Sequence, residues 1–336
     1  MNQNDSGTTK PTTVDAGGEK PSRLSIDEAI KYLFTSEKQA LIRLVNSALG
    51  ENHDLDETEL IELHTEFINR KTAPDDEPDG ESFNLEKIIA DMIFSLNGTV
   101  YHIEFQTNAD KTIAIRIMGY GTRYALRALR NKEAGGEVIF ELPVPVLIQI
   151  DKDESLADKI PAKIKISGGE DALAFDITVI RLWEYGVDEL VKRGYYLLLP
   201  FLLLRHRKGK KTDESARSLV EDIKRIEKAI AELYKNGLIY SNLRTNLYEV
   251  ADGIAKNINE KYYDNNLEID GELKKMGATR ALYAQELVAR GKAEITQVIR
   301  LFMQNKTAGE ISKILGIPEQ EVADILRETG LAGVSN

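Results

Sequence analysis

The sequence predicts an α/β protein in which a short mixed β-sheet is flanked by helices and followed by a helical C-terminal region. Three observations predict this class. Helical patterning precedes a β-hairpin centred on Asn97-Gly98, and helical periodicity follows the hairpin over residues 112–131. Two apolar strands come later, at residues 144–150 and 174–180. This order is typical of a sheet covered by helices.

The N-terminal segment is polar. Residues 1–22 are rich in Thr, Gly, Asp and Pro, which predicts a disordered tail. Helical patterning begins near Ser25, and the apolar spacing within residues 51–72 is compatible with a further helix. Residues 75–80 read Asp-Asp-Glu-Pro-Asp-Gly, which predicts a loop ahead of the hairpin.

Capping motifs mark the ends of several predicted helices. Ser36 and Gln39 form a capping box that opens a helix ending just before Gly50. Thr212 caps a later helix, and another is predicted around residues 278–304.

The Asn97-Gly98 hairpin sets a register. If these two residues are the whole loop, Asp91 lies directly opposite Glu104 as a non-hydrogen-bonded pair, at roughly 4.5 Å between Cα atoms. Two carboxylates held this way repel each other and destabilise a sheet. A divalent cation between them reverses that penalty, so the register predicts a metal site.

The two faces of the hairpin differ in chemistry. Acidic and amide groups project together from one face, which carries Asp91, Glu104 and Gln106. An ordinary half-exposed strand with solvated charges is the alternative interpretation of that face. The opposite face is apolar and predicts core positions for Met92, Phe94, Leu96, Tyr101, Ile103 and Phe105.

The helix predicted over residues 112–131 carries Arg116, Tyr120 and Arg123 at positions i, i+4 and i+7, along one side. That side starts soon after Gln106, so it can flank the proposed metal-bearing strand. Residues 138–142 and 144–150 predict further strands beyond it.

Asp91, the Tyr-His-Ile-Glu-Phe-Gln run of residues 101–106, and the Arg-Ile-Met-Gly-Tyr run of residues 116–120 together resemble the PD-(D/E)XK nuclease superfamily. More narrowly, they resemble its branch of transposases and recombination-promoting (Rpn-like) nucleases, which have Glu-x-Gln where most relatives have Glu-x-Lys. The likeness continues through residues 31–34, residues 198–201 and the helical tail.

The resemblance implies a restriction-endonuclease-like core and a divalent-metal-dependent DNA endonuclease that acts in transposition or recombination. Asp91 and Glu104 would be metal ligands, with the backbone carbonyl of Phe105 as a third. The implied cofactor is Mg²⁺ (or Mn²⁺), since hard cations prefer carboxylate and carbonyl oxygens.

Gln106 replaces the Lys of most relatives, which orients the attacking water and offsets negative charge. A neutral Gln can position a water or donate to a phosphate oxygen, so the chemistry would depend more on the metal or on Arg116. Alternatively, activity is low or lost, and the chain is a nuclease-fold protein acting as a protein-interaction module. Arg116 and Arg123 as nucleic-acid contacts, and Tyr120 as a positioning or stacking group, compete with plain structural roles.

Two further side chains are minor candidates for the same site. His102 lies beside Glu104 on the polar face and could carry a proton. Relatives often have another acidic residue on the first helix, for which Glu37 and Glu28 are both possible counterparts.

The net charge of −11 is unevenly distributed. Residues 51–91 hold fourteen Asp/Glu against three Lys/Arg, which accounts for the whole excess. Residues 92–130 hold five Lys/Arg against two Asp/Glu, a modest positive field suited to a DNA partner. Residues 205–211 carry five Lys/Arg and no acid, which predicts either a grip on a nucleic-acid backbone or a solvated loop.

The C-terminal region has helix-turn-helix rhythm. Thr307 and Glu310 form a capping box, Gly316 ends the first helix, and Pro318 suits the start of the second. The second helix carries three acidic side chains and one basic one, so phosphates would repel it. We interpret residues 307–328 as a packing or dimerisation unit, with a homo-oligomer through the C-terminal helices as one arrangement.

The sequence therefore divides into four segments. These are a tail at 1–22, a nuclease-like core at 23–205, a helical extension at 206–290, and a helical packing unit at 291–336. The absence of cysteine excludes disulfides and thiolate metal sites. The apolar run 195–204 is too short to span a bilayer and no signal-peptide core is present, so we expect a cytoplasmic protein without a membrane partner.

Overall fold

A computed structural model describes the chain over most of its length. The described residues are 26–63, 89–107, 110, 112–130, 140–165, 167–208, 211–304, 306–317, 322 and 325–326. The predicted tail at 1–22, the predicted loop at 75–80 and Pro318 lie outside them.

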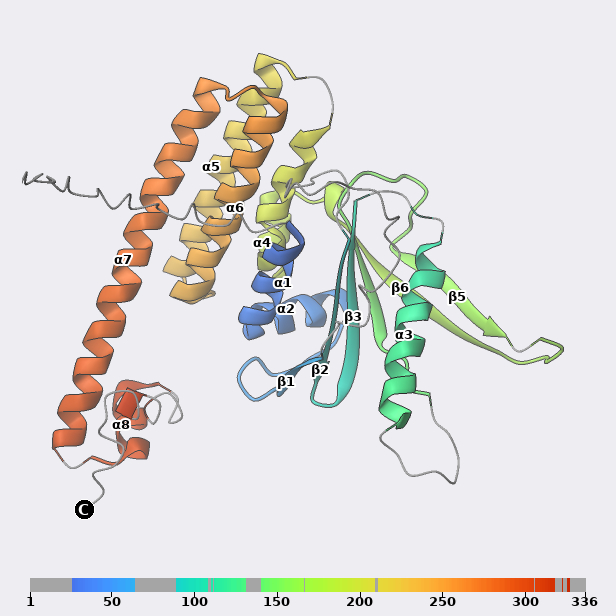
Figure 1. Ribbon diagram of the computed structural model, residues 1–336, viewed down its shortest axis with the longest axis horizontal. Helices are drawn as coiled ribbons and strands as arrows, with labels where there is room; N and C mark the ends of the chain where they lie inside the picture. The colour runs from blue at the N-terminus through green and yellow to red at the C-terminus, as the bar shows by residue number, and fades with distance from the viewer. Residues whose placement is uncertain are drawn as a thin grey trace, which may run out of the picture.

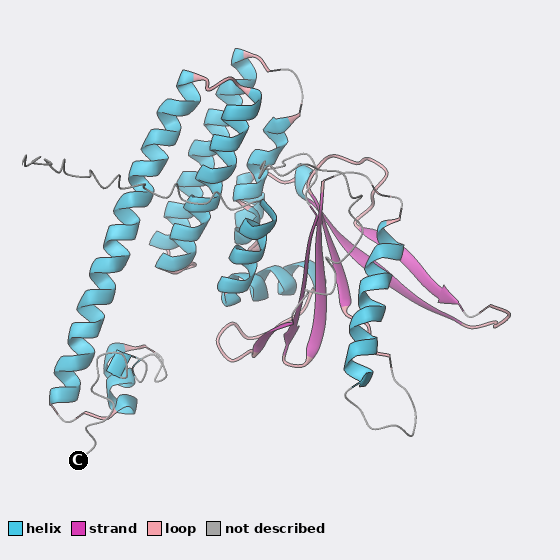
Figure 2. Cartoon of the chain, in the orientation of Figure 1, coloured by secondary structure: helices cyan, strands magenta, loops and turns pink. Residues whose placement is uncertain are grey.

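The described strands form one six-stranded mixed sheet in the order β1-β2-β3-β4-β6-β5 (Figures 1 and 2). Its strands are β1 (Leu60–Leu63), β2 (Ile89–Leu96), β3 (Thr99–Gln106), β4 (Val144–Gln149), β5 (Lys159–Lys165) and β6 (Ala172–Arg181). The β3–β4 and β4–β6 pairs are parallel and the other pairs are antiparallel. The predicted α/β class, a mixed sheet flanked by helices, is confirmed.

The predicted hairpin is also confirmed. Asn97 and Gly98 take positive φ angles of 47° and 88°, as a tight two-residue turn requires. The turn places Asp91 opposite Glu104 in the β2–β3 ladder, with Ala90 opposite Phe105.

The helices surround this sheet on both faces. They are α1 (Ile26–Ser36), α2 (Lys38–Leu49), α3 (Ile113–Arg130), α4 (Val187–Arg193), α5 (Asp213–Lys235), α6 (Ser241–Tyr262), α7 (Leu267–Met303) and α8 (Ala308–Leu315). Three short 3₁₀ segments are η1 (Leu182–Glu184), η2 (Tyr196–Leu198) and η3 (Pro200–Arg207). Figure 1 shows α3 on one side of the sheet and the other helices on the opposite side.

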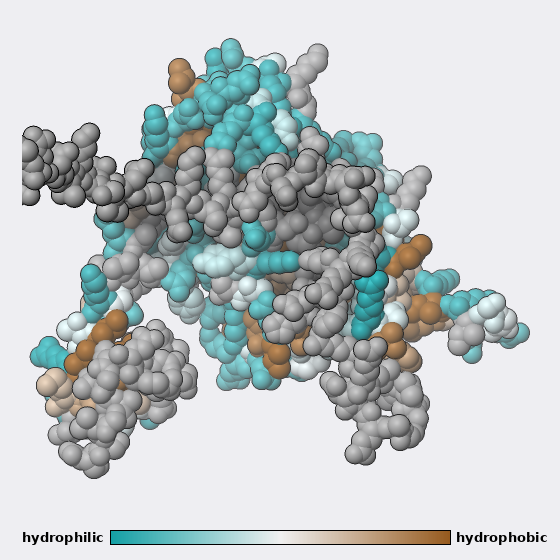
Figure 3. Space-filling view, viewed as in Figure 1, coloured by the Kyte–Doolittle hydropathy of each residue, from teal (hydrophilic) through white to brown (hydrophobic). Residues whose placement is uncertain are grey.

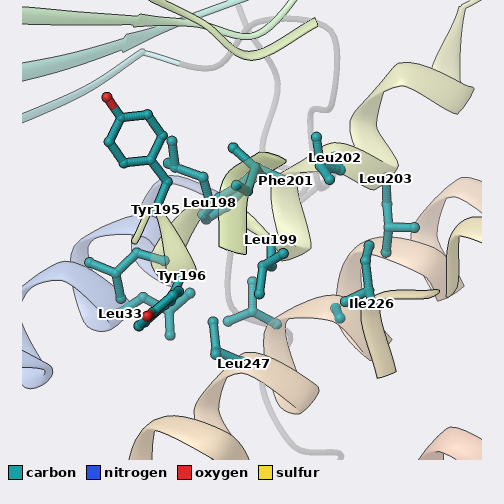
Figure 4. Packing of buried hydrophobic residues seen from close by; sticks show 14 of the residues in the cluster. Leu33, Tyr195, Tyr196, Leu198, Leu199, Phe201, Leu202, Leu203, Ile226 and Leu247 are labelled. Carbon is teal, nitrogen blue, oxygen red and sulfur yellow. The ribbon is translucent and has the colours of Figure 1, made fainter. Parts of the chain in front are cut away.

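The larger core covers the apolar face of the hairpin, as predicted. Phe105 is fully buried there between the rings of Phe34 and Phe201, at centroid distances of 5.0 and 5.9 Å. The apolar 3₁₀ segments run through this core between α1 and the helical bundle, where Leu199 lies near Leu247 (Figure 4). One hydrophobic cluster thus joins the predicted 23–205 and 206–290 segments.

A smaller core lies under α3, on the other face of the sheet. Ile113 and Ile117 of α3 pack there on Leu147, Ile177 and Val179. Glu104 and Gln106 project from this same face, where Arg116 of α3 contacts both.

Several local predictions are wrong. Glu37, not Ser36, precedes α2, and no side-chain capping bond forms there, because α1 runs through Ser36. Within the predicted 51–72 helix, residues 60–63 form strand β1, which pairs with β2. Residues 140–142 of the predicted 138–142 strand are not in a strand, and β5 was not predicted.

The helix-end predictions at Gly50, Thr212 and Thr307 are confirmed, since each has the expected cap. The helix predicted around 278–304 begins earlier, at Leu267, and passes without a break through the boundary expected at residue 290.

The C-terminal segment packs on the end of α7. Val298 of α7 forms a small cluster with Ile311, Val322 and Leu326, which agrees with a packing unit. Among the described residues, none of the helices combines the length and apolar composition needed to cross a bilayer.

Candidate active site

Arg116 joins α3 to the polar edge of β3. Its Nη2 donates to Glu104 Oε1 and, at 2.8 Å, to Gln106 Oε1. The spacing of Glu104 and Gln106, two residues apart on one strand, places both acceptors on the face that α3 covers. The structure therefore brings together three residues that the sequence assigned to one site.

Asp110 is a further partner of Arg116 that the sequence analysis missed. Its Oδ2 accepts from Arg116 Nη1 at 3.0 Å, and its Oδ1 accepts from the Thr112 backbone N–H at 2.7 Å. Partial burial acts to raise the pKa of Asp110, but the hydrogen bonds from Thr112 and the charge of Arg116 prevail and lower it. The Asp-x-Thr pattern just before a predicted helix is the signal that could have identified this residue.

Burial makes the Glu104 ion pair electrostatically important. The Glu104 side chain is fully buried, whereas the Arg116 side chain remains 23% exposed. A carboxylate removed from water needs a cation or several donors, because desolvation otherwise costs several kcal/mol. In this structure a guanidinium meets that need.

Asp91 is placed by the backbone alone. The register sets it directly across from Glu104, and directly opposed residues project from the same face of a sheet. Its side chain lies outside the described part of the structure. Among the side chains that are described, no three His, Cys, Asp or Glu residues form a metal-binding group.

The donor chemistry at the 91/104 pair nevertheless fits a hard divalent cation. Glu104 supplies a carboxylate, and the register brings a second acidic residue opposite it. Counting outward from the turn makes Ala90 and Phe105 a hydrogen-bonded pair, so the Phe105 carbonyl points toward β2. A carbonyl oxygen retains a second lone pair, so this role in the ladder leaves it able to coordinate a metal.

His102 and Tyr120 lie together next to this constellation. Their rings meet edge to face with centroids 5.6 Å apart. His102 is 1% exposed, so a proton-carrying role would require a path to solvent through the α3 contact. Arg123, one helical turn beyond Tyr120, is exposed on the surface of α3.

Glu37 faces the helical bundle. The side-chain amide of Asn246 on α6 donates to the Glu37 carboxylate at 2.8 Å, and the Tyr32 hydroxyl donates to the side-chain oxygen Oδ1 of Asn246 at 3.1 Å. Burial raises the pKa of Glu37 to about 7, although the hydrogen bond from Asn246 opposes this effect. The other proposed counterpart, Glu28, is exposed on α1.

Gln149 extends the polar row into the centre of the sheet. It lies opposite Gln106 in the parallel β3–β4 ladder and is 1% exposed. Its amide donates to the Thr107 carbonyl at 3.2 Å, which ties the end of β3 to β4. A Gln at the end of an otherwise apolar strand was the available sequence signal.

Within the described part of the basic run, residues 205–208 and 211, His206, Arg207 and Lys208 lie within ion-pair distance of acidic side chains. Arg207 is 4% exposed and forms an ion pair with Asp151, and His206 lies 2.8 Å from Asp222. The expectation of a solvated loop is therefore wrong for Arg207 and His206, and the nucleic-acid contact stays a prediction. Lys208 is more exposed but also pairs with Asp151, at 2.6 Å.

Comparison with models of known protein families, with curated proteins and with solved structures gives no match to this chain.

Proposed function

We propose that the chain is a divalent-metal-dependent phosphodiester hydrolase that acts on DNA. The observation that carries the proposal is that the hairpin and helix α3 bring together side chains that the sequence assigned to one site. Arg116 contacts both Glu104 and Gln106, and the hairpin register sets Asp91 opposite Glu104. The role in transposition or recombination, and the restriction-endonuclease-like identity of the core, rest on the sequence resemblance.

In this proposal Asp91 and Glu104 hold Mg²⁺ or Mn²⁺, with the Phe105 carbonyl as a further ligand. A divalent cation supplies a Lewis acid for phosphodiester hydrolysis when it is bound. Gln106 orients water or the substrate phosphate through its amide, which carries no net charge. Arg116, whose side chain is partly exposed, would supply the positive charge that a Lys provides in most members of the family that the sequence resembles.

Nicking of supercoiled plasmid with Mg²⁺, together with calorimetric titration of Mn²⁺, tests the proposal. We expect Asp91→Ala and Glu104→Gln each to abolish nicking and to weaken Mn²⁺ binding. Glu232→Gln is a matched control, because Glu232 is 60% exposed on α5. Equal nicking by wild type and Asp91→Ala, or no Mn²⁺ binding by wild type, would remove the proposal.

A specific observation favours a second candidate, a nuclease-fold protein that acts only as a protein-interaction module. Glu104 is completely buried and already neutralised by Arg116, as a structural ion pair would be. This candidate predicts a wild-type protein that binds no Mn²⁺ and forms a defined oligomer in solution. The same titration, combined with light scattering, separates the two functions.

A further inference from the structure

A polar cleft lies on the other side of the sheet from Glu104. It has a volume of about 590 Å³ and is formed by α2, the loop that follows it, and the end of α4. Tyr196 of the large core forms part of its lining. The cleft is wide and open to solvent, so a ligand there would be held by contacts with charged side chains rather than by enclosure.

Three cations line this cleft. Lys192 and Arg193 come from the last turn of α4, and Arg43 comes from α2. Arg193 Nε forms an ion pair with Glu189 Oε1 at 2.8 Å, and the Arg193 guanidinium lies 5.1 Å from the centre of the Tyr185 ring. In the part of the chain that the structure describes, neither Arg43 nor Lys192 forms an ion pair with an acidic side chain.

Two acidic residues belong to this region: Asp54 lines the cleft itself, and Glu51 contacts the lining residue His53. Asp54 accepts hydrogen bonds from the backbone N–H groups of Asp56 and Glu57, each at 2.8 Å. Glu51 accepts from the Tyr101 hydroxyl and lies 2.6 Å from His53. Neither carboxylate forms an ion pair with Arg43 or Lys192, although Asp54 keeps its negative charge within the cleft because the backbone hydrogen bonds lower its pKa.

The helix dipole explains only part of this arrangement. Basic residues in the last turn of a helix interact favourably with its C-terminal end, which accounts for Lys192 and Arg193 on α4. Arg43 occupies the middle of α2, where that effect is absent. Arg43 lies against the residue that ends α4, since a Cβ at Gly194 would be in ordinary van der Waals contact with the Arg43 Cβ at 3.7 Å.

We propose that this cleft binds a phosphate monoester of nucleotide size, with the phosphate between Arg43 and Lys192. A guanidinium and an ammonium give charge-assisted hydrogen bonds to a dianionic phosphate. Ser47 and Asn52 line the same cleft with polar groups. The exposed acids at Asp56, Glu57 and Glu59 would repel a longer polyanionic backbone leaving the cleft, which favours a compact ligand.

Calorimetric titration of the full chain with AMP, adenosine and inorganic phosphate tests this site. We expect AMP and phosphate to bind and adenosine, which lacks the phosphate, not to bind. Arg43→Gln and Lys192→Gln should each weaken AMP binding by about tenfold, the loss of one charge-assisted hydrogen bond. Lys228→Gln on α5, where the lysine is 77% exposed, is the matched control and should leave AMP binding unchanged.

Two further arms identify the source of the phosphate and guard against misfolding. Arg43→Lys keeps the charge and should retain most of the AMP affinity. The oligonucleotide dT₁₀ with a 5′-phosphate should bind more weakly than AMP, because the acids beside the cleft repel its backbone, and dT₁₀ with a 5′-hydroxyl should not bind. Equal binding of AMP and adenosine, equal binding of the two oligonucleotides with no AMP binding, or equal weakening by Lys228→Gln would overturn the proposal.

Discussion

The two faces of the sheet bury different kinds of side chain. On the face toward α1 and the bundle, aromatic and aliphatic side chains form one continuous apolar core. On the face toward α3, a small apolar cluster lies beside a buried carboxylate, its arginine partner and two glutamines. The hairpin strands supply both faces, because their side chains alternate.

The difference separates stability from chemistry. On the face toward the bundle, several helices contribute apolar side chains to the core, and this packing requires no charged partner. The α3 face is covered by a single helix, which is held by a small apolar cluster and by the ion pair between Arg116 and Glu104. Figure 3 shows a mostly hydrophilic surface over the bundle and apolar patches on the side of the molecule that carries β5 and β6. Leu173 of β6 is an exposed apolar side chain.

The largest expected effect is on the apolar face. Phe105→Ala should lower the free energy of unfolding by about 3–5 kcal/mol, because it leaves a cavity between two aromatic rings. Ile117→Ala, in the smaller cluster under α3, should cost about 2 kcal/mol because fewer apolar side chains surround it. Urea denaturation of both variants measures the difference, and equal losses would show that the two faces contribute alike.

The next effect isolates the ion pair. Arg116→Met leaves Glu104 buried without its cation and should destabilise the protein by about 3 kcal/mol. The double variant Glu104→Leu, Arg116→Met removes both charges and should recover to within about 1 kcal/mol of wild type. A double-mutant cycle in urea gives the coupling energy. If the two single losses simply add, the pair has no role in holding α3 on the sheet.

The hairpin could be predicted from the residues of the turn and its two strands alone. The turn residues fix the register, and period-two alternation then assigns Asp91, Glu104 and Gln106 to one face. The same alternation predicted which residues of the hairpin form its apolar face. These features were predictable because each depends only on residues close together in the chain.

The failed predictions involve partners distant in the sequence. Residues 60–63 became strand β1 because β2 offered an open edge, which outweighed helical spacing. Arg207 was expected at the surface, but Asp151 lies more than fifty residues earlier and pairs with it inside the fold. The contact of Arg116 with Glu104 likewise depends on how α3 docks, which its own periodicity does not specify.

A smaller effect links the ion pair to the proposed metal site. Because Arg116 and a cation would compete for the Glu104 carboxylate, Arg116→Gln should tighten Mn²⁺ binding by about tenfold. Arg123→Gln, which removes a charge from the exposed surface of the same helix, is the control and should change the affinity little. Tighter binding by both variants would indicate a general field effect, and weaker binding by Arg116→Gln would mean that the arginine supports the metal.

The smallest expected effect contrasts Glu104 with Glu37, a carboxylate whose hydrogen-bond donor is a neutral amide. Burial raises the pKa of Glu37 to about 7, above the ordinary value of 4.5. The folded protein therefore binds this proton more tightly than the unfolded chain does, so the contribution is fully present below pH 4.5 and is lost as the pH rises through about 7.

Glu37→Gln should accordingly flatten the dependence of the melting temperature on pH between 5 and 8. The change should be partial, since burial and the neighbouring Glu272 also raise the pKa of Glu227 to about 7. Glu227→Gln should remove a further part, and Glu232→Gln, on the exposed face of α5, should remove none. If Glu37→Gln left the slope unchanged, the amide contact with Asn246 would suffice to keep that carboxylate charged, and the need for a cation would be specific to the α3 face.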